Sequence, residues 1–285
     1  MHGGKFLILK KILKVVLGAY LYDFLRHVIA HKRIPRPLKP VTFNDKILHR
    51  KFHDRNPDYL LVADKLLVRD YVAEHINEDI LTTLYFYGDN AFDINFDILP
   101  EAFVIKATHG SGPDFIEFIR DKQQFGKTKL WQVAQELLDK EYGNITNEWW
   151  YTEVAPQIII EEMLQDDEYG IPVDYKFFVM HGVVKFVQVD YSRFVDHTRT
   201  FYDRDWFPQE FTLKYRMGPV TPRPKRLSEM ISIAESLGKG FDFVRIDLYC
   251  VNNERVVFGE MTLAPEAGWG RFKPAKWDRV LGAMW

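Results

Sequence analysis

The sequence predicts an α+β fold, with a helical N-terminal part and a mixed or antiparallel sheet in the second half of the chain. Three observations predict this class. A helical pattern of apolar residues runs from residue 43 to about 74, and most strand-like patterns follow residue 157. Two of those strands are joined by His181-Gly182, a two-residue turn that implies antiparallel pairing. The 285 residues, 47% of them hydrophobic, suffice for one or two domains with a large core.

The first 40 residues form a basic arm. They contain nine lysines and arginines against one acid, Asp23, so their formal charge is +8, which leaves −10 for the rest of a chain whose total is −2. A helix over residues 5–29 would place Lys10, Lys11 and Lys14 on one side, within roughly 100° of arc, and the apolar residues elsewhere. Such a helix either lies on an anionic membrane surface or packs on the body of the protein. Three prolines among the basic residues of 33–40 predict an extended linker.

The N-terminal region does not have the pattern of a membrane span or a signal peptide. Its longest uncharged apolar run, residues 15–22, is too short to cross a bilayer, and lysines interrupt the apolar region that a signal peptide needs. The single cysteine, Cys250, excludes an intrachain disulfide and fits a reducing compartment. We therefore expect a cytoplasmic protein, with peripheral contact at the inner face of the membrane as an alternative. The acidic body argues against nucleic acid as a partner.

The remaining elements follow in order. The helical pattern of 43–74 breaks at 54–57, where Asn56-Pro57 fits the end of one helix and the start of another. Strand patterns at 80–87, 103–107 and 115–119 precede a helix at 128–142, which Gly143 is expected to cap. The second half holds strand patterns at 157–162, 173–180, 183–190, 199–203, 242–250 and 254–261. A helix at 225–237, ending at Gly238, lies among them.

Lys106 lies in an apolar strand pattern just before a loop of small and hydroxyl residues, Thr108-His109-Gly110-Ser111-Gly112. Glycine lets backbone N–H groups approach phosphate oxygens because no Cβ stands in the way, and a lysine on the preceding strand can reach the same phosphates. The loop lacks the Gly-Lys pair, followed by Ser or Thr, of a Walker A motif. The alternatives are a phosphate-binding hairpin loop and an ordinary hairpin turn.

Two late strand patterns each carry a carboxylate in an otherwise apolar run, Asp247 in "VRIDLY" and Glu260 in "VVFGEMT". If the strands pair as a hairpin, the two carboxylates can share one face, and Arg245 joins them because side chains two residues apart point the same way. Buried carboxylates need a compensating charge. That charge is either Mg²⁺, held by carboxylates and nucleotide phosphates with the arginine on a phosphate, or the arginine itself in a buried ion network.

A third acidic segment is "IIIEEML", residues 158–164, where an apolar strand ends in paired acids. Glu161 and Glu162 are placed to meet the amino group of adenine or the hydroxyls of ribose at a strand-end hinge. Asp174 and Lys176 alternate onto one face of the next apolar strand. Solvated charges near strand ends are the alternative for each of them.

The order of these features resembles the ATP-grasp superfamily. More narrowly, the segments "FVIKATHGSG", "EWWYTEVAPQIIIEEML", "DYKFFVMHG", "FYDRDW" and "FGEMT" are similar to the TupA-like ATP-grasp family, over about residues 41–270. That family is tied to teichuronopeptide and other cell-surface polysaccharide biosynthesis, and some members are labelled glycosyltransferases. The resemblance implies an ATP-grasp fold of two α+β subdomains with the nucleotide between them, preceded by a helical N-terminal segment. The implied divisions are 1–40, 41–160 and 161–285.

The resemblance also implies a role for each matching residue. The phosphates would be contacted by Lys65 and Lys106 and surrounded by His109, Gly110, Ser111 and Gly112. The adenine and ribose hinge would be Glu161, Glu162, Met163 and Leu164, and further nucleotide contacts would come from Asp174 and Lys176. Arg245 would stabilise the transferred phosphoryl group, and Mg²⁺ would be held by Asp247, Glu260 and Thr262. Thr262 departs from the pattern, because many ATP-grasp ligases have asparagine there. The chain also shows no full α/β domain ahead of the nucleotide-binding region, which leaves the substrate-binding half of the site undefined.

The implied reaction has two steps, in which ATP converts a carboxylate to an acyl phosphate and an amine then displaces phosphate. The implied substrates are a sugar-acid carboxylate of a cell-surface polysaccharide or its precursor, and an amino acid or another amine. Arg193 and Arg271 are candidates to stabilise the tetrahedral oxyanion, against a surface or structural role for each. The other functions considered are a glycosyltransferase, a phosphotransferase and a non-catalytic scaffold.

Two aromatic segments, 147–153 and 201–207, either stack on sugar rings or belong to the core. The segment 265–274 is expected to form a loop that closes over the site.

Overall fold

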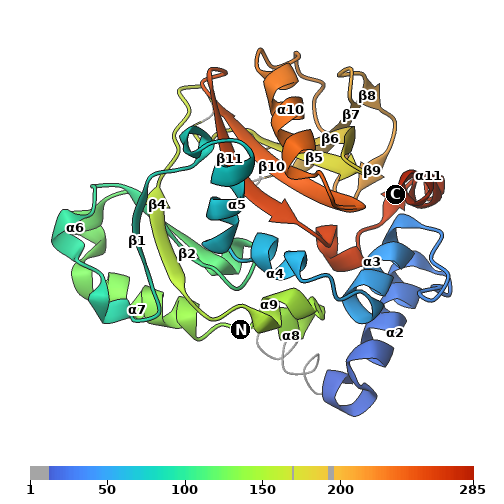
Figure 1. Cartoon of the computed structure of the whole chain (residues 1–285), viewed down its shortest axis with the longest axis horizontal. Coiled ribbons are helices and arrows are strands. Elements are labelled where there is room, and N and C mark those ends of the chain that lie inside the picture. The colour runs from blue at the N-terminus through green and yellow to red at the C-terminus, as the bar shows by residue number, and fades with distance from the viewer. Residues whose placement is uncertain (1–12, 169, 192–195) are drawn as a thin grey trace.

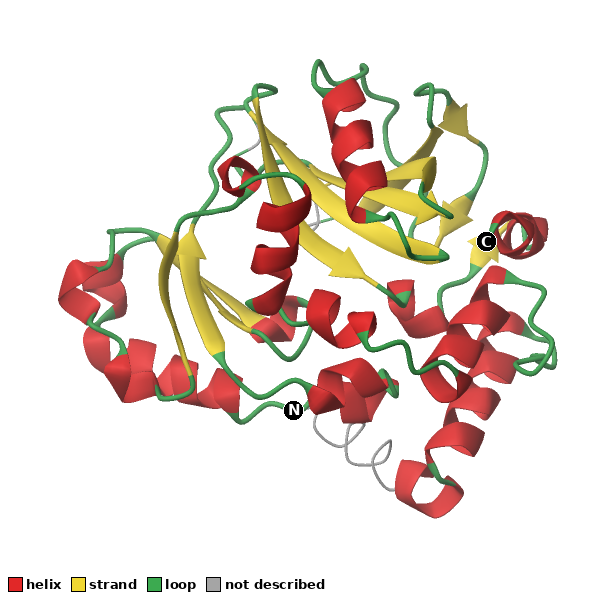
Figure 2. Ribbon diagram, viewed as in Figure 1, coloured by secondary structure: helices red, strands yellow, loops and turns green. Residues whose placement is uncertain are grey.

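The computed structural model describes residues 13–168, 170–191 and 196–285 (Figure 1). The predictions for Lys10, Lys11 and Arg193 lie outside the described residues. The described strands form two main sheets, which lie on different sides of the molecule with α5 between them in this view (Figure 2).

The first sheet has the strand order β1-β4-β2-β3 and is antiparallel throughout. Its strands are β1 (Leu84–Gly88), β2 (Phe103–Ala107), β3 (Ile116–Ile119) and β4 (Ile158–Glu162). Helices α6 (Lys122–Phe125) and α7 (Lys127–Leu138) are neighbours in sequence, and α7 packs on β2 and β4 through Leu130 and Ala134. Because Ile158 and Ile160 are fully buried, β4 anchors the sheet and fixes the carboxylates that follow them.

The second sheet has six strands in the order β11-β10-β5-β6-β7-β8, again with antiparallel pairing. Its strands are β5 (Asp174–Met180), β6 (Val183–Tyr191), β7 (Thr198–Asp203), β8 (Pro208–Gln209), β10 (Phe243–Val251) and β11 (Arg255–Thr262). Helix α10 (Leu227–Leu237) packs on β5, β6 and β10 and covers one face. The other face is therefore free to form the wall of a site.

The helices of the N-terminal half also support the second sheet. They are α2 (Ala19–His31), α3 (Phe43–His53), α4 (Asp58–Ala63) and α5 (Leu67–His75), and short 3₁₀ turns follow at Glu78–Ile80, Ala91–Asp93, Phe96–Ile98 and Pro113–Phe115. Arg50 of α3 is buried and donates to the backbone oxygens of Phe243 and Leu263, both at 2.9 Å. This contact ties α3 to the β10 end of the second sheet.

The C-terminal segment returns to the same helices. A two-stranded sheet joins β9 (Thr212–Leu213) to β12 (Phe272–Lys273), and a 3₁₀ turn at Pro265–Gly268 precedes β12. The last helix, α11 (Lys276–Met284), packs against α3. Two short helices, α8 (Gly143–Thr146) and α9 (Trp149–Glu153), lie between α7 and β4 in sequence, and α9 packs on α4. The division of the chain at residues 40 and 160 stays a prediction.

Most predicted elements are present, with three corrections at their ends. The helix predicted at 128–142 stops at Leu138, and Gly143 opens α8 instead of capping α7. A Cβ at Gly143 would lie 2.8 Å from the backbone N of Thr152, so this glycine permits close packing of α8 on α9. The strand predicted at 80–87 begins only at Leu84, and the helical stretch 58–74 divides after Ala63.

The predicted hairpin at His181-Gly182 is confirmed. Both residues have positive φ, 50° and 75°, and Met180 pairs with Val183. The break at 54–57 is also confirmed, because α3 ends at His53 and α4 begins at Asp58. Helix α2 packs on the body through Tyr22, Asp23 and His27, as one of the two alternatives for the basic arm predicted.

Within the described ranges, the structure contains no helix of the length and hydropathy that a membrane span requires.

Candidate active site

A cavity of about 1250 Å³ lies between the two sheets. Its first wall comes from β2, β3 and β4 and includes Val104, Lys106 and Glu161. Its second wall comes from β5, β6, β7, β10 and β11, and residues of the segment 262–273 close one end. Most of the predicted site residues lie at this cavity: Lys65, Lys106, Ser111, Gly112, Glu161, Glu162, Leu164, Asp174, Lys176, Arg245, Asp247, Glu260, Thr262 and Arg271. Three others, His109, Gly110 and Met163, are not among the residues that line it.

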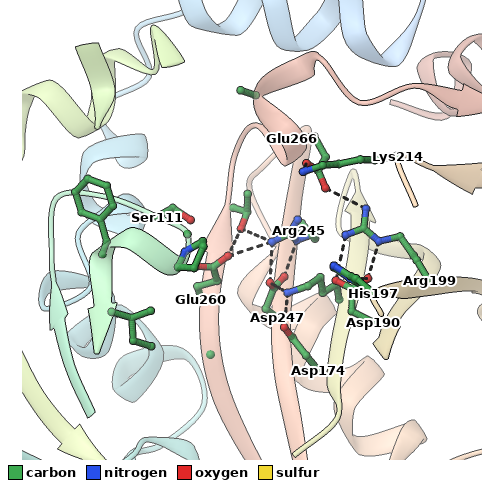
Figure 3. A pocket seen from close by; sticks show the side chains of 18 of the residues that line it. Ser111, Asp174, Asp190, His197, Arg199, Lys214, Arg245, Asp247, Glu260 and Glu266 are labelled. Carbon is green, nitrogen blue, oxygen red and sulfur yellow. Dashed lines mark hydrogen bonds and ion pairs between the residues drawn. The ribbon is translucent and has the colours of Figure 1, made fainter. Parts of the chain in front are cut away.

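The pairing of β10 with β11 brings the two predicted metal carboxylates together. Asp247 lies directly opposite Glu260 in the ladder, and the register shifts immediately afterwards between Asp247 and Leu248. Arg245 donates to both oxygens of Asp247 at 2.7 Å and to Glu260 Oε1 at 3.1 Å (Figure 3). The prediction that these three side chains share one face is therefore confirmed.

Lys176 extends this network along β5. Its Nζ donates to Asp174 Oδ2 at 2.6 Å and also contacts Asp247. Burial raises the pKa of Asp247 to about 6, against the opposing charges of Arg245 and Lys176. Burial also opposes ionisation of Glu260, but Arg245, Lys176 and Lys65 lower its pKa to about 2. Glu260 is thus ionised at neutral pH, and Asp247 is mostly so, with both carboxylates engaged by Arg245.

The donor atoms fit Mg²⁺ only together with phosphate. Asp247 and Glu260 offer hard carboxylate oxygens, which Mg²⁺ prefers. Across the described ranges, however, no group of three or more His, Cys, Asp or Glu side chains is gathered for a metal. The hydroxyl of Thr262 accepts from Arg245 and donates to Glu260, both at 2.9 Å, so it orients the Glu260 carboxylate. The remaining ligands of Mg²⁺ would have to be phosphate oxygens and water.

The two predicted phosphate lysines lie on the opposite wall. Lys106 forms an ion pair with Glu161, which also accepts from the hydroxyl of Thr82 at 2.8 Å. Lys65 donates to the backbone oxygen of Gly110. Burial lowers the pKa of Lys65 to about 8, although the nearby charge of Glu260 opposes the change. The Glu161 side chain is thus held by protein groups, and contacts to adenine or ribose are left to the residues that follow it.

The glycine-rich loop has two glycines that no other residue could replace without strain. A Cβ at Gly110 would meet the ring of Phe115 at 2.4 Å, and Gly112 has φ 93°. Between them Ser111 reaches the cavity and lies on the far side of Glu260 from Arg245 in Figure 3. His109 is buried, and its Nε2 lies 2.9 Å from the backbone oxygen of Lys140. The ring of His109 thus holds the loop against the segment after α7, and its contact with nucleotide stays a prediction.

An apolar part of the cavity adjoins these lysines. It is lined by Val104, Ile116, Phe118, Leu164 and Phe258, which come from both walls. Flat apolar surfaces on either side of a slot suit a purine base. Glu162, in contrast, pairs with Arg255 at 2.6 Å at the rim.

A second charged cluster was not predicted from the sequence. Asp190 of β6 accepts two hydrogen bonds from Arg199 of β7, at 2.6 and 3.1 Å, and lies 3.3 Å from the ring of His197. Arg199 also donates to Glu266 at 3.1 Å, and Lys214 donates to Glu266 at 2.7 Å (Figure 3). Burial opposes ionisation of Asp190, but His197 and Arg199 hold its pKa well below the usual range. Charged residues within the apolar strand patterns around 190 and 199 were the signal that could have identified this cluster.

The aromatic segments belong mainly to the core. Trp150 is fully buried, and Tyr202 stacks on Trp206 with ring centroids 4.0 Å apart. The interpretation that these rings stack on sugar is wrong for all three. Trp269, which lies in the predicted loop 265–274, does reach the cavity, and the guanidinium of Arg26 lies 3.4 Å from the centre of one of its rings.

Comparison with known proteins gives the family. The sequence model of a family described as TupA-like ATPgrasp matches residues 45–285. The chain belongs to the TupA-like ATP-grasp family. The two-sheet architecture is accordingly the ATP-grasp fold that the sequence predicted. A search of curated proteins gave no match.

Several solved structures are similar to this TupA-like chain. D-cycloserine synthetase DcsG is 14% identical, with a TM-score of 0.46, over 80% of this chain and 71% of its own. The D-alanine–D-alanine ligase from Bacillus anthracis, complexed with ATP, is 14% identical, with a TM-score of 0.45, over 79% and 63%. The ATP-grasp ligase PsnB is 8% identical, with a TM-score of 0.41, over 72% of this chain and 54% of its own. The chain thus spans about half of the length of PsnB.

Proposed function

We propose that this TupA-like chain is an ATP- and Mg²⁺-dependent ligase that joins a carboxylate to an amine through an acyl phosphate. One observation carries the proposal. A single cavity is lined by Lys65, Lys106, Ser111, Arg245, Asp247 and Glu260, and Ser111 lies on the far side of Glu260 from Arg245 (Figure 3). Phosphoryl transfer depends mainly on positioned positive charge and aligned substrates, and this arrangement supplies both without a side-chain nucleophile.

The nucleotide is proposed to bind between the walls. Its base occupies the apolar slot between Val104 and Phe258, next to the strand end at Leu164. Lys65 and Lys106 neutralise phosphate oxygens, and Ser111 and Gly112 offer hydroxyl and backbone donors from the loop. Lys106 must then exchange part of its ion pair with Glu161 for a phosphate, which its partial exposure allows.

Arg245 and Lys176 are proposed to act on the transferred phosphoryl group. They already hold Asp247 and Glu260 in place, and a phosphate bound beside them would share the same donors. Mg²⁺, when bound by Asp247 and Glu260 with phosphate oxygens, would neutralise the charge that builds up during transfer. Arg245 remains beside the acyl phosphate and can stabilise the oxyanion of the second step, as can Arg271 at the cavity rim.

The substrate carboxylate is proposed to come from a sugar acid of a cell-surface polysaccharide or its precursor, with an amino acid or another amine as its partner. The lining near the second charged cluster supports an anionic substrate. Lys214, Arg216, Arg271 and Lys273 are exposed there, whereas Asp190 and Glu266 are already engaged by Arg199. An excess of cations at a cavity entrance attracts an anionic substrate. The family resemblance supplies the polysaccharide context.

Nucleotide binding and ADP release test the proposal. Wild-type protein is expected to bind ATP in a Mg²⁺-dependent way and to release ADP when a uronic acid and an amine are both present. Lys106→Ala and Asp247→Asn are expected to lower turnover about 100-fold, because the first removes a positive charge from the phosphates and the second weakens the binding of Mg²⁺. Lys239→Ala, an exposed lysine away from the cavity, is the matched control.

Other outcomes would favour other functions. Binding of a UDP-sugar in place of ATP would favour a glycosyltransferase, and a phosphorylated acceptor formed without an amine would favour a phosphotransferase. If no nucleotide binds, the ligase proposal fails, and a non-catalytic scaffold is the function that remains.

The protein is also proposed to be cytoplasmic and to touch the inner face of the membrane through α2. Leu21, Leu25 and Ile29 are exposed at four-residue spacing on the side opposite the buried Asp23 and His27. With the basic residues of the arm, this stripe suits an anionic lipid surface. Wild-type protein should co-sediment with vesicles containing phosphatidylglycerol and not with phosphatidylcholine vesicles. Leu25→Asp/Ile29→Asp should abolish the binding, and equal sedimentation of this variant would contradict the contact.

A further inference from the structure

Glu148 is a buried carboxylate at the cavity wall that the proposed reaction has not yet used. It lies between α8 and α9, lines the cavity, and is only 3% exposed. Its Oε1 is buried and accepts no hydrogen bond from any described residue. Desolvating a carboxylate without a full set of partners is costly, so a position of this kind is commonly functional.

Among the described residues, Glu148 has no lysine or arginine that pairs with it alone. Lys51 of α3 acts electrostatically on Glu148, but its Nζ lies 2.5 Å from Oδ2 of Asp23 and is committed to that carboxylate. The remaining neighbours are the hydroxyls of Thr146 and Tyr142, which hydrogen bond to the Glu148 side chain. Lys51 and these two hydroxyls favour the charged form, whereas burial and Asp23 oppose it, and burial is the largest effect.

The surroundings of Glu148 within the cavity are aromatic. Tyr142 and Tyr151 line the same cavity, and both feel the charge of Glu148. Faces of aromatic rings attract cations, and a carboxylate beside them adds a full negative charge. A ligand that suits this end of the cavity is therefore an organic ammonium group, whereas the exposed lysines and arginines near Glu266 suit an anion.

Tyr142 connects this end to the nucleotide loop. Its hydroxyl hydrogen bonds to Ser111, which faces Glu260 across the cavity, and also to Glu148. Glu148 and Glu260 both act electrostatically on Tyr142 and Tyr151, so both carboxylates lie near these two tyrosines. An amine held by Glu148 would thus lie close to the region where the acyl phosphate forms.

We propose that Glu148 binds the amine substrate as an ammonium ion and takes the proton that the amine must lose before it attacks. The inference rests on the proposed ligase function and assigns the amine to a specific end of the cavity. Tyr142 positions the carboxylate by its hydrogen bond, and Tyr151 lies beside the alkyl group of the amine.

The proton and bond changes balance. The ammonium gives one proton to Glu148 and becomes a neutral amine, whose electron pair forms the C–N bond to the acyl carbon. The tetrahedral intermediate then collapses, the C–O bond to phosphate breaks, and the departing phosphate takes the second proton of the nitrogen as hydrogen phosphate. Glu148 returns its proton to solvent before the next cycle.

Two nucleophiles separate this role from a structural one. Hydroxylamine is largely unprotonated at neutral pH and needs no base, whereas an alkylamine does. The acid substrate is first identified as the acid that stimulates ADP release. With that acid, Glu148→Gln should lower the rate of amide formation roughly 100-fold or more, which is the usual effect of losing a general base. The same variant should lower the rate of hydroxamate formation less than about threefold. Glu153→Gln, on the exposed face of α9, should change neither rate. Glu148→Asp should retain part of the amide rate.

The pH profile gives a second readout. The wild-type amide rate should rise up to about pH 7, where Glu148 loses its proton, and then level off, whereas the rate of Glu148→Gln should keep rising with pH as the free amine itself loses its proton. Equal losses of amide and hydroxamate in Glu148→Gln would show a structural role and overturn the proposal, as would no loss of either.

Binding of a simple ammonium probe needs no acid substrate. Ethylammonium chloride, titrated into the ATP-bound protein at pH 8 and followed by NMR, should bind wild type at least tenfold more tightly than Glu148→Gln. Equal or absent binding would overturn the proposal. Failure of the ligase proposal is recognised separately, because no acid would then stimulate ADP release in wild type.

Discussion

The carboxylates at the cavity differ in how their charge is compensated. Asp247, Glu260 and Asp190 each accept from a buried arginine. Glu148 has no such partner among the described residues, and burial raises its pKa to about 7. The protein thus keeps one carboxylate poised between its two protonation states at neutral pH, next to several that stay ionised.

This difference predicts a gain in stability on neutralising Glu148. Its pKa is higher in the folded protein than in the unfolded chain, so the folded state binds more protons and the stability contribution falls as the pH rises from about 4.5 to about 7. Above that range the cost is roughly 3 kcal/mol, at 1.36 kcal/mol for each pKa unit. Glu148→Gln should therefore raise the free energy of unfolding in urea at pH 8 and change it little at pH 4.5. A loss of stability at pH 8 would contradict the assigned environment.

Single residues also show how far the site could be predicted from the sequence. Asp247, Glu260 and Lys176 were recognisable because a charge in an apolar strand needs a partner, and the structure supplies one for each. Glu148 and Asp190 were not recognised, since their burial depends on contacts with α2, α3 and β7 that no local pattern contains. The bond of His109 to the Lys140 backbone was not predicted, because a position in a glycine-rich loop does not reveal which way the ring points.

At the level of elements, the pairing of β10 with β11 contains a β-bulge. Asp247 pairs with Glu260, but the next residue, Leu248, pairs with Phe258, so Gly259 is an extra residue in β11. Such a bulge bends the strand and changes the direction of the side chain beside it. Here it keeps Glu260 directed toward Arg245 and the cavity.

A side chain at Gly259 should therefore impair the site more than the fold. A Cβ there would lie 3.0 Å from both the backbone oxygen of Asp247 and the ring of Tyr249. Gly259→Val is expected to weaken Mg²⁺-dependent ATP binding at least tenfold, because the strand must shift to relieve this contact. Isothermal calorimetry measures the binding and circular dichroism the fold. Gly88→Ala is the control, since its Cβ would meet only the far end of the Phe86 ring. Unchanged ATP affinity in Gly259→Val would show that the bulge does not contribute to the nucleotide site.

The elements that the sequence predicted well are those with a strong local signal. The hairpin at His181-Gly182 and the helix ending at Leu237 follow from turn chemistry and periodicity. Strands β8, β9 and β12 have two residues each, too few for a pattern, and exist because neighbouring strands pair with them. Gly143 was read as a helix cap because its packing against α9 is a tertiary contact.

In the molecule as a whole, chain order and spatial order differ. Helix α3 comes early in the sequence, yet Arg50 bonds to the backbone of Phe243 and Leu263 at the second sheet, and its guanidinium lies 4.6 Å from the ring of Trp285. Trp285 in turn donates to Asp242 at 2.7 Å. Residues from both ends of the described chain thus stabilise one edge of the second sheet.

This organisation predicts which parts of the molecule unfold together. Trp285→Ala removes a large buried ring and should cost about 3–5 kcal/mol in the free energy of unfolding. In hydrogen exchange, α3 and β10 should exchange faster in this variant, while β2 and β4 of the first sheet should change little. If β2 and β4 lost protection equally, the two sheets would have to be regarded as one cooperative unit.

Trp269 gives the cavity an optical property. Its indole N–H is bonded to Asp23 at 2.6 Å, and its ring system lies between the charges of Arg26 and Lys51 at the edge of the cavity. Indole emission responds to charge and to water, so a substrate entering beside it would shift the fluorescence spectrum. The difference between wild type and Trp269→Phe would isolate this signal from the other six tryptophans. The protein therefore carries its own spectroscopic sensor of occupancy, through which candidate amines and acids can be screened before any product is identified.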